Sequence, residues 1–137
     1  MRPEISFEFF PPKNIEATFR LWDAVQVLAP LAPRFVSVTY GAGGTTRDLT
    51  REVVATLVKH SGLRTAAHLT CVEATREETL EIARGFAAAG VRDIVALRGD
   101  PPKGAAGFQA HPEGFASSVE LIEALAATGD FTLRVGA

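Results

Sequence analysis

The sequence predicts an α/β fold, a partial (β/α)8 TIM barrel of about five parallel strands and four helices. Short apolar segments recur about every 30 residues, and each is followed by a longer segment with helical periodicity. Parallel strands need such crossovers, because a tight turn cannot return the chain in the same direction. The strand segments mix β-branched and other apolar residues, which is expected of strands covered on both faces.

Five segments have strand character and four have helical character. The predicted strands are residues 5–9, 35–39, 66–70, 94–98 and 132–136. The first predicted helix, 14–29, has one apolar face formed by Leu21, Trp22, Val25, Leu28 and Ala29. The second helix repeats this spacing at Leu49, Val53, Val54, Leu57 and Val58, and the fourth at Phe115, Val119, Ile122 and Leu125.

The third predicted helix, 75–89, carries signals for both of its ends. Thr75 is followed three residues later by Glu78, a capping box in which each side chain satisfies a backbone N–H group at the helix start. Gly90 follows the segment and is a natural C-terminal stop.

Two architectures fit such a chain, a (β/α) barrel and an open doubly wound sheet. A dinucleotide-binding sheet is expected to carry a Gly-x-Gly-x-x-Gly turn after its first strand, but Pro11 and Pro12 stand there instead, which favours the barrel. A complete barrel has eight strands and about 250 residues. Residues 1–137 are therefore expected to be the N-terminal portion of a single, truncated barrel domain, whose unpaired strand edges favour self-association.

The composition excludes several classes of partner. The chain is 47% hydrophobic and 22% charged, with a net charge of −2 and no basic block, so neither nucleic acid nor an anionic membrane is expected. No apolar run approaches the roughly 20 residues of a membrane span, and no signal-peptide pattern follows Met1, so we expect a cytoplasmic protein. The single cysteine, Cys71, is expected to be a small buried residue at a strand end and not a reactive thiol.

Polar residues gather at the predicted C-terminal ends of four successive strands. They are Glu8, Thr39, His68 and the run Arg98-Gly99-Asp100. The C-terminal strand ends of a barrel surround its active site, so the pattern predicts a small-molecule site without specifying a reaction.

Glu8 lies between Phe7 and Phe9, where a carboxyl group would lose hydration. This favours the protonated form and suits the group to donate a proton near neutral pH. The alternative is a structural glutamate paired with a nearby Arg or Lys. Asp100 has the same two interpretations, a site residue or a turn-forming aspartate paired with Arg98.

His68 and the Gly-rich turn 39–46 are less specific. A lone strand histidine is more often a satisfied core residue than a ligand, and no further His, Cys or acid stands at metal spacing, so no metal is expected. The turn could let backbone N–H groups meet a phosphate or a flat ring, or could simply connect a strand to a helix. It lacks the Lys of a P-loop, which argues against hydrolysis of a nucleoside triphosphate.

Four segments resemble motifs of the methylenetetrahydrofolate reductases. They are residues 6–13 (SFEFFPPK), 35–42 (FVSVTYGA), 67–71 (AHLTC) and 94–102 (IVALRGDPP). The four occur in the family's order and at its spacing, and the resemblance covers essentially the whole chain.

The resemblance implies a barrel that carries FAD at its C-terminal mouth and uses NAD(P)H to reduce 5,10-methylenetetrahydrofolate to 5-methyltetrahydrofolate. Glu8 is implied to be the general acid that helps open the folate ring, and Asp100 to contact the pterin near the flavin. The residues implied to hold FAD are Thr39, Tyr40, Ala42, His68, Arg98, Gly99, Asp100, Phe115 and Ala116. The family implies one-carbon metabolism, methionine biosynthesis and a homo-oligomer when complete.

Three interpretations therefore compete. The chain is part of a reductase, or a half barrel that keeps a partial flavin surface or self-associates without turnover, or an unrelated barrel enzyme that uses Glu8 as an acid. Four ordered motifs argue against the third. Because a missing barrel half exposes apolar faces and strand edges, we expect the isolated chain to bind FAD weakly or not at all and to have negligible activity.

Overall fold

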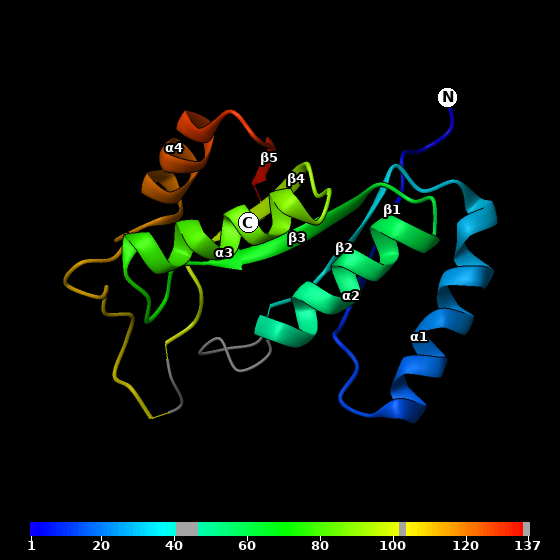
Figure 1. The fold of residues 1–137 in the computed structure, drawn as a ribbon, viewed down its shortest axis with the longest axis horizontal. Helices are drawn as coiled ribbons and strands as arrows, with labels where there is room; N and C mark the ends of the chain where they lie inside the picture. Colours follow the sequence, from blue (N-terminus) through cyan, green and yellow to red (C-terminus); the bar gives the residue numbers. More distant parts are fainter. Residues whose placement is uncertain (41–46, 102–103, 136–137) are drawn as a thin grey trace.

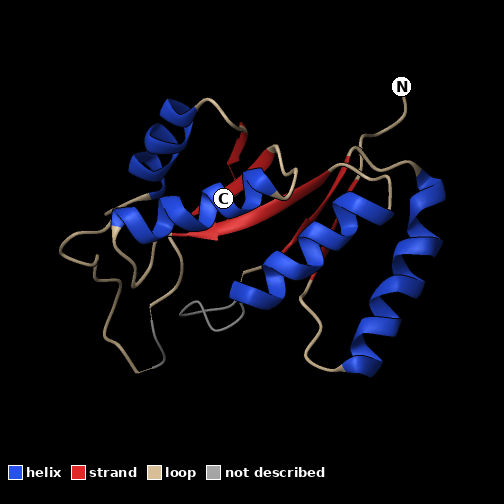
Figure 2. Cartoon of the chain, viewed as in Figure 1, coloured by secondary structure: helices blue, strands red, loops and turns tan. Residues whose placement is uncertain are grey.

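A computed structural model describes residues 1–40, 47–101 and 104–135, in which strands and helices alternate (Figures 1 and 2). The strands are β1 (Ser6–Phe9), β2 (Phe35–Val38), β3 (Thr65–Thr70), β4 (Asp93–Leu97) and β5 (Thr132–Val135). The helices are α1 (Ile15–Leu28), α2 (Arg47–His60), α3 (Arg76–Ala88) and α4 (Ser118–Thr128), and a short 3-10 helix, η1 (Ala29–Leu31), follows α1.

The five strands form one parallel sheet in the order β1-β2-β3-β4-β5. A doubly wound sheet reverses its strand order part of the way across, whereas a barrel adds its strands in sequence. The consecutive order therefore confirms the partial barrel, and the described residues contain the five strands and four α-helices that were predicted.

Alternation along the strands gives the sheet two different faces. One face packs against the helices, and in Figures 1 and 2 α2 and α3 lie across the front of the sheet. Its buried strand residues are Phe9, Val36, Val38, Ala67, Leu69, Ile94 and Ala96, and they share one core with helix residues such as Val25, Leu57, Phe86 and Leu125. The strand residues between them, including Glu8, Ser37 and His68, belong to the opposite face.

Side-chain caps fix where the helices begin. The Asn14 side chain accepts a hydrogen bond from the Ala17 N–H group at 2.8 Å, so α1 starts one residue later than predicted. The predicted capping box of α3 is confirmed, because Glu78 N–H donates to the Thr75 hydroxyl and Thr75 N–H donates to the Glu78 carboxylate. Gly90 ends this region with a φ of +94°.

The predicted start of α4 at Phe115 is wrong. The helix begins at Ser118, because the Ser117 side chain accepts the Glu120 N–H group at 3.3 Å and so caps the first turn. Phe115 lies in the preceding loop, where its side chain is 2% exposed and part of the core. A buried aromatic residue just before a helix has the same sequence signature as the first apolar residue of that helix.

Two residues assigned to buried helix faces are instead exposed. Leu49 on α2 is 39% exposed and Val119 on α4 is 61% exposed. Their neighbours Thr50 and Leu121 are completely buried, and the Thr50 hydroxyl donates to the Thr39 carbonyl at 3.0 Å. That hydrogen bond lets a polar residue occupy a core position at the start of α2.

Candidate active site

Three strands bring Glu8, Ser37 and His68 together near the C-terminal edge of the sheet. Glu8 and Ser37 are direct neighbours in the register of β1 and β2, and His68 lies on β3 two residues beyond the partner of Ser37. The His68 Nε2 atom is 3.1 Å from a Glu8 carboxylate oxygen and 3.2 Å from the Ser37 hydroxyl oxygen. The topology thus groups two of the predicted site residues, and adds a serine that the sequence did not single out.

The prediction that aromatic neighbours remove Glu8 from water is wrong. Its side chain is 54% exposed, because Phe7 and Phe9 alternate to the helix-covered face while Glu8 lies on the other face of an edge strand. Among the described residues, the proposed structural pairing with an Arg or Lys is also not found, and the group that faces the Glu8 carboxylate is the His68 ring.

His68 is buried, with 7% of its surface exposed. Burial lowers the pKa of His68, and the nearby Glu8 carboxylate opposes this with a smaller effect. The imidazole is therefore neutral near pH 7, and its contact with Glu8 at that pH is not an ion pair. Among the described residues, no three His, Cys, Asp or Glu side chains gather as a metal site.

The buried Tyr40 hydroxyl lies beside the Arg47 guanidinium, but the two do not meet hydrogen-bond geometry, and no other partner lies within the described ranges. Burial raises the pKa of Tyr40, and the neighbouring Arg47 guanidinium lowers it by less. Thr39 is held by its backbone, since its N–H group donates to the Phe9 carbonyl at 2.9 Å. Ala42 and the rest of the Gly-rich turn, 41–46, lie outside the described residues.

Thr70 and Gly99 form a second part of the same edge. The buried Thr70 hydroxyl has no hydrogen-bond partner in the described parts of the chain, and Thr70 shares the sheet face of His68. Gly99 has a φ of +91°, and a Cβ atom there would lie 2.7 Å from Val72 Cγ1 and 3.0 Å from Thr70 Cβ. Only glycine fits this position without strain, so the chain after β4 can pack closely against Val72 and Thr70.

Arg98 and Asp100 follow the end of β4 and do not pair with each other. The Arg98 guanidinium lies over the Phe108 ring at 4.4 Å from its centroid, and Asp100 is exposed. No ion pair joins the two residues, both of which are described, so the alternative of a paired turn aspartate is wrong. Cys71 is completely buried after β3, as predicted, and its thiol lies 3.4 Å from the Arg98 carbonyl oxygen.

Phe115 and Ala116 contact the helices. The Arg76 guanidinium lies over the Phe115 ring at 5.0 Å, and Ala116 N–H donates to the Glu120 carboxylate at 2.9 Å. The Phe115 side chain is therefore committed to the core, and its suggested role in holding FAD stays a prediction.

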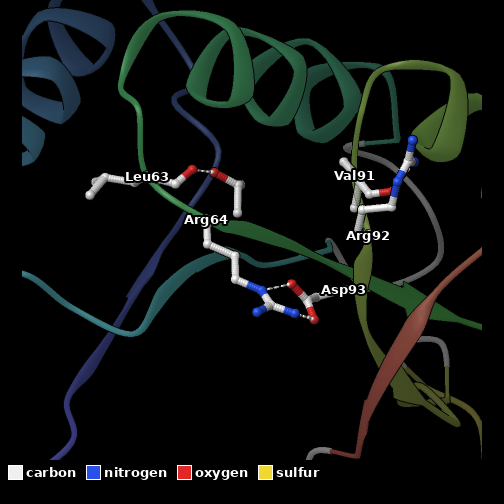
Figure 3. A network of polar contacts seen from close by, with 6 residues as sticks. Leu63, Arg64, Val91, Arg92 and Asp93 are labelled. Carbon is white, nitrogen blue, oxygen red and sulfur yellow. Dashed lines mark hydrogen bonds and ion pairs between the residues drawn. The ribbon is translucent and has the colours of Figure 1, made fainter.

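A separate polar cluster lies at the opposite edge, where β3 and β4 begin (Figure 3). Arg64 donates to both carboxylate oxygens of the completely buried Asp93, at 2.5 and 2.8 Å. Arg92 donates to the carbonyls of Ala87 and Val91. A cavity of about 730 Å³ opens beside these residues, but their polar atoms are paired within the fold. In a barrel this edge serves stability, whereas the catalytic groups lie at the other one.

Comparison with known proteins identifies the family of the chain. The profile of the family described as methylenetetrahydrofolate reductase matches residues 1–137. The chain is 42% identical over 136 residues to 5,10-methylenetetrahydrofolate reductase of Pectobacterium carotovorum subsp. carotovorum, covering 99% of this chain and 44% of the relative. The corresponding protein of Escherichia coli (strain K12) is 44% identical over 133 residues, covering 97% and 43%.

A plant relative matches the same region. It is methylenetetrahydrofolate reductase (NADH) 1 of Zea mays, 34% identical over 131 residues, which are 95% of this chain and 22% of the relative. The chain thus spans less than half the length of these curated relatives. No helix among the described residues is long and apolar enough to cross a membrane. The family profile covers every residue, and the sheet has the strand order of a barrel: the chain belongs to the methylenetetrahydrofolate reductase family.

Proposed function

We propose that residues 1–137 form the N-terminal portion of a single barrel domain that reduces 5,10-methylenetetrahydrofolate to 5-methyltetrahydrofolate with FAD and NAD(P)H. The observation that carries this proposal is the position of Glu8. Its side chain is half exposed on the face of the sheet opposite the helix-packed core, 3.1 Å from His68. A substrate at this edge can reach the carboxyl group, while the buried imidazole holds it in place.

The polar atoms of the same edge fit a flavin. Within the described residues, the buried Thr70 hydroxyl has no hydrogen-bond partner, and the buried Tyr40 hydroxyl lies beside the Arg47 guanidinium, so both could bond to a ligand. The residues proposed to hold FAD are Thr39, Tyr40, Ala42, His68, Arg98, Gly99 and Asp100, with Phe115 and Ala116. When bound, the flavin supplies hydride transfer from NAD(P)H to the folate.

Glu8 is proposed to move one proton. The proton leaves the Glu8 carboxyl group for the folate ring nitrogen as the bond between that nitrogen and the methylene carbon breaks. The resulting carboxylate can then accept a hydrogen bond from His68. Asp100, which is exposed and makes no ion pair with Arg98, is free to contact the pterin.

The test is Glu8→Gln in the complete reductase that contains these residues. We expect folate reduction to be abolished, because the amide cannot donate the required proton, while reduction of the flavin by NADH stays largely intact. Stopped-flow absorbance of the flavin measures the two half-reactions separately. Glu4→Gln is the matched control, because this exposed carboxylate pairs with Arg34 and lies away from the site. An equal loss in both half-reactions would refute the acid role.

The second candidate is an inactive half barrel that only binds part of a flavin or self-associates. It is favoured by the apolar outer surface of α1, where Ile15, Phe19 and Val27 are 76%, 66% and 73% exposed. The purified 137-residue chain distinguishes the two, through its flavin absorbance, its NADH oxidation with an electron acceptor, and its mass in solution. A yellow, active monomer would rule out the inactive form. The complete protein is proposed to be a cytoplasmic homo-oligomer.

A further inference from the structure

Ser37 contacts the proposed site but has no role in the reaction described so far. It is 5% exposed in the middle of β2, between the completely buried Val36 and Val38. A hydroxyl group in such a place is costly unless it forms a hydrogen bond. Its recorded side-chain partner is His68 Nε2, at 3.2 Å.

The same nitrogen also faces Glu8, so two oxygens compete for one ring atom. Because burial lowers the pKa of His68, the ring is neutral near pH 7 and carries a single hydrogen for its two nitrogens. An ionised carboxylate is a far better acceptor than a serine hydroxyl, whereas a protonated carboxyl group competes for the hydrogen only weakly. If the hydrogen lies on Nε2, it therefore has a different preferred partner in each protonation state of Glu8.

We propose that Ser37 is a positioning residue that holds the His68 Nε2 hydrogen while Glu8 is protonated and releases it to Glu8 once the proton has gone to the folate. The inference rests on the acid role proposed above. In the step, the Glu8 O–H bond breaks and an N–H bond forms on the folate ring nitrogen. At the same time the bond between that nitrogen and the methylene carbon breaks, and the Nε2–H group exchanges the Ser37 oxygen for the new carboxylate oxygen.

This arrangement keeps Glu8 ready to act as an acid. If Nε2–H pointed permanently at Glu8, it would stabilise the carboxylate and leave less of the protonated form. Other titratable groups at this edge are Tyr40 after β2, and Arg98 and Asp100 after β4. In the described part of the chain, Glu8 is the group whose charge acts on His68.

The test is Ser37→Ala in the complete reductase, measured as the folate half-reaction against pH. The rate falls as pH rises, because it needs protonated Glu8. Losing a competing neutral hydrogen bond is expected to lower the midpoint of this fall by about 0.7 pH unit, and the rate above the midpoint about fivefold. Flavin reduction by NADH and the flavin absorbance spectrum should not change. Ser37→Thr keeps the hydroxyl and should restore the wild-type midpoint.

The matched control is Thr65→Val, which removes a buried hydroxyl from β3 that donates to the Leu63 carbonyl at 3.1 Å. It should lower stability without moving the midpoint. Should Ser37→Ala not fold, Ser37→Cys, whose thiol forms weaker hydrogen bonds, is expected to shift the midpoint in the same direction. An unshifted or raised midpoint in the folded variant would overturn the proposal.

Histidine 15N NMR gives a readout that does not depend on turnover. The chain has three histidines, and the chemical shifts of the His68 ring report which nitrogen carries the hydrogen. We expect it on Nε2, and a hydrogen on Nδ1 would overturn the proposal, since Nε2 would have nothing to share. Loss of folate reduction in Glu8→Gln combined with wild-type behaviour in Ser37→Ala would refute this inference alone. Folate reduction that survives Glu8→Gln would refute the proposed function itself.

Discussion

Replacing Gly99 with alanine tests how closely the backbone after β4 packs against β3. Gly99 and Gly104 lie in the same connection and have similar φ angles, +91° and +87°. A Cβ at Gly104 meets nothing within 4 Å, whereas one at Gly99 lies 2.7 Å from Val72 Cγ1. Both variants thus bear the cost of a positive φ, about 1 kcal/mol. Only Gly99→Ala adds the overpacking cost, typically about 1–3 kcal/mol.

Val72 cannot readily move away, because it is β-branched and 2% exposed. We therefore expect Gly99→Ala to lose roughly 2 kcal/mol more than Gly104→Ala. With a urea m-value of about 2 kcal/mol/M, this difference moves the unfolding midpoint by roughly 1 M. Circular dichroism in urea at two protein concentrations measures the midpoints and excludes an effect of self-association. Equal losses in the two variants would show that the close contact at Gly99 is not rigid.

Three further predictions concern stability. Thr75→Ala should cost about 1 kcal/mol, because it breaks the capping box of α3, while Thr56→Ala, at an exposed position of α2, should cost almost nothing in the same urea experiment. Arg64→Met should lower the urea midpoint more than Arg84→Met, because Arg64 pairs with the buried Asp93 and Arg84 with exposed Glu77 and Glu81; equal shifts would contradict this. Because burial lowers the pKa of His68, the unfolded chain binds that proton first, and stability falls as pH drops below about 6.5. His68→Gln should therefore flatten the unfolding free energy between about pH 6.5 and 5, and unchanged slopes would refute this.

The fold was predictable from the sequence because its signals are local. Helix caps at Thr75 and a stop at Gly90 act within a few residues, and strand–helix repetition leaves few topologies to consider. The errors arose where contacts with residues distant in the sequence determine whether a side chain is buried. Thr50 is buried because it reaches the Thr39 carbonyl, and Phe115 is buried because the loop before α4 folds into the core. Neither partner can be read from the spacing of apolar residues.

The site was predictable only in outline. Strand ends predicted that Glu8 and His68 would share one edge, and the structure pairs them. The environment of Glu8 was misjudged because residues adjacent in a strand point to opposite faces, so neighbouring phenylalanines do not cover it. Ser37 and Thr70 were not singled out, although both lie inside recognised motifs, because the Ser37 contact runs across strands and the burial of the unpaired Thr70 hydroxyl depends on its surroundings.

The two edges of the sheet differ in a way that itself indicates where the chemistry lies. At the edge where β3 and β4 begin, the completely buried Asp93 is held by two hydrogen bonds from Arg64. At the other edge, Tyr40 and Thr70 bury hydroxyls that the described residues leave without a partner. Each such group costs about 1–3 kcal/mol unless something satisfies it. A ligand bound at this edge would supply the missing hydrogen bonds, which is the property expected of a binding site.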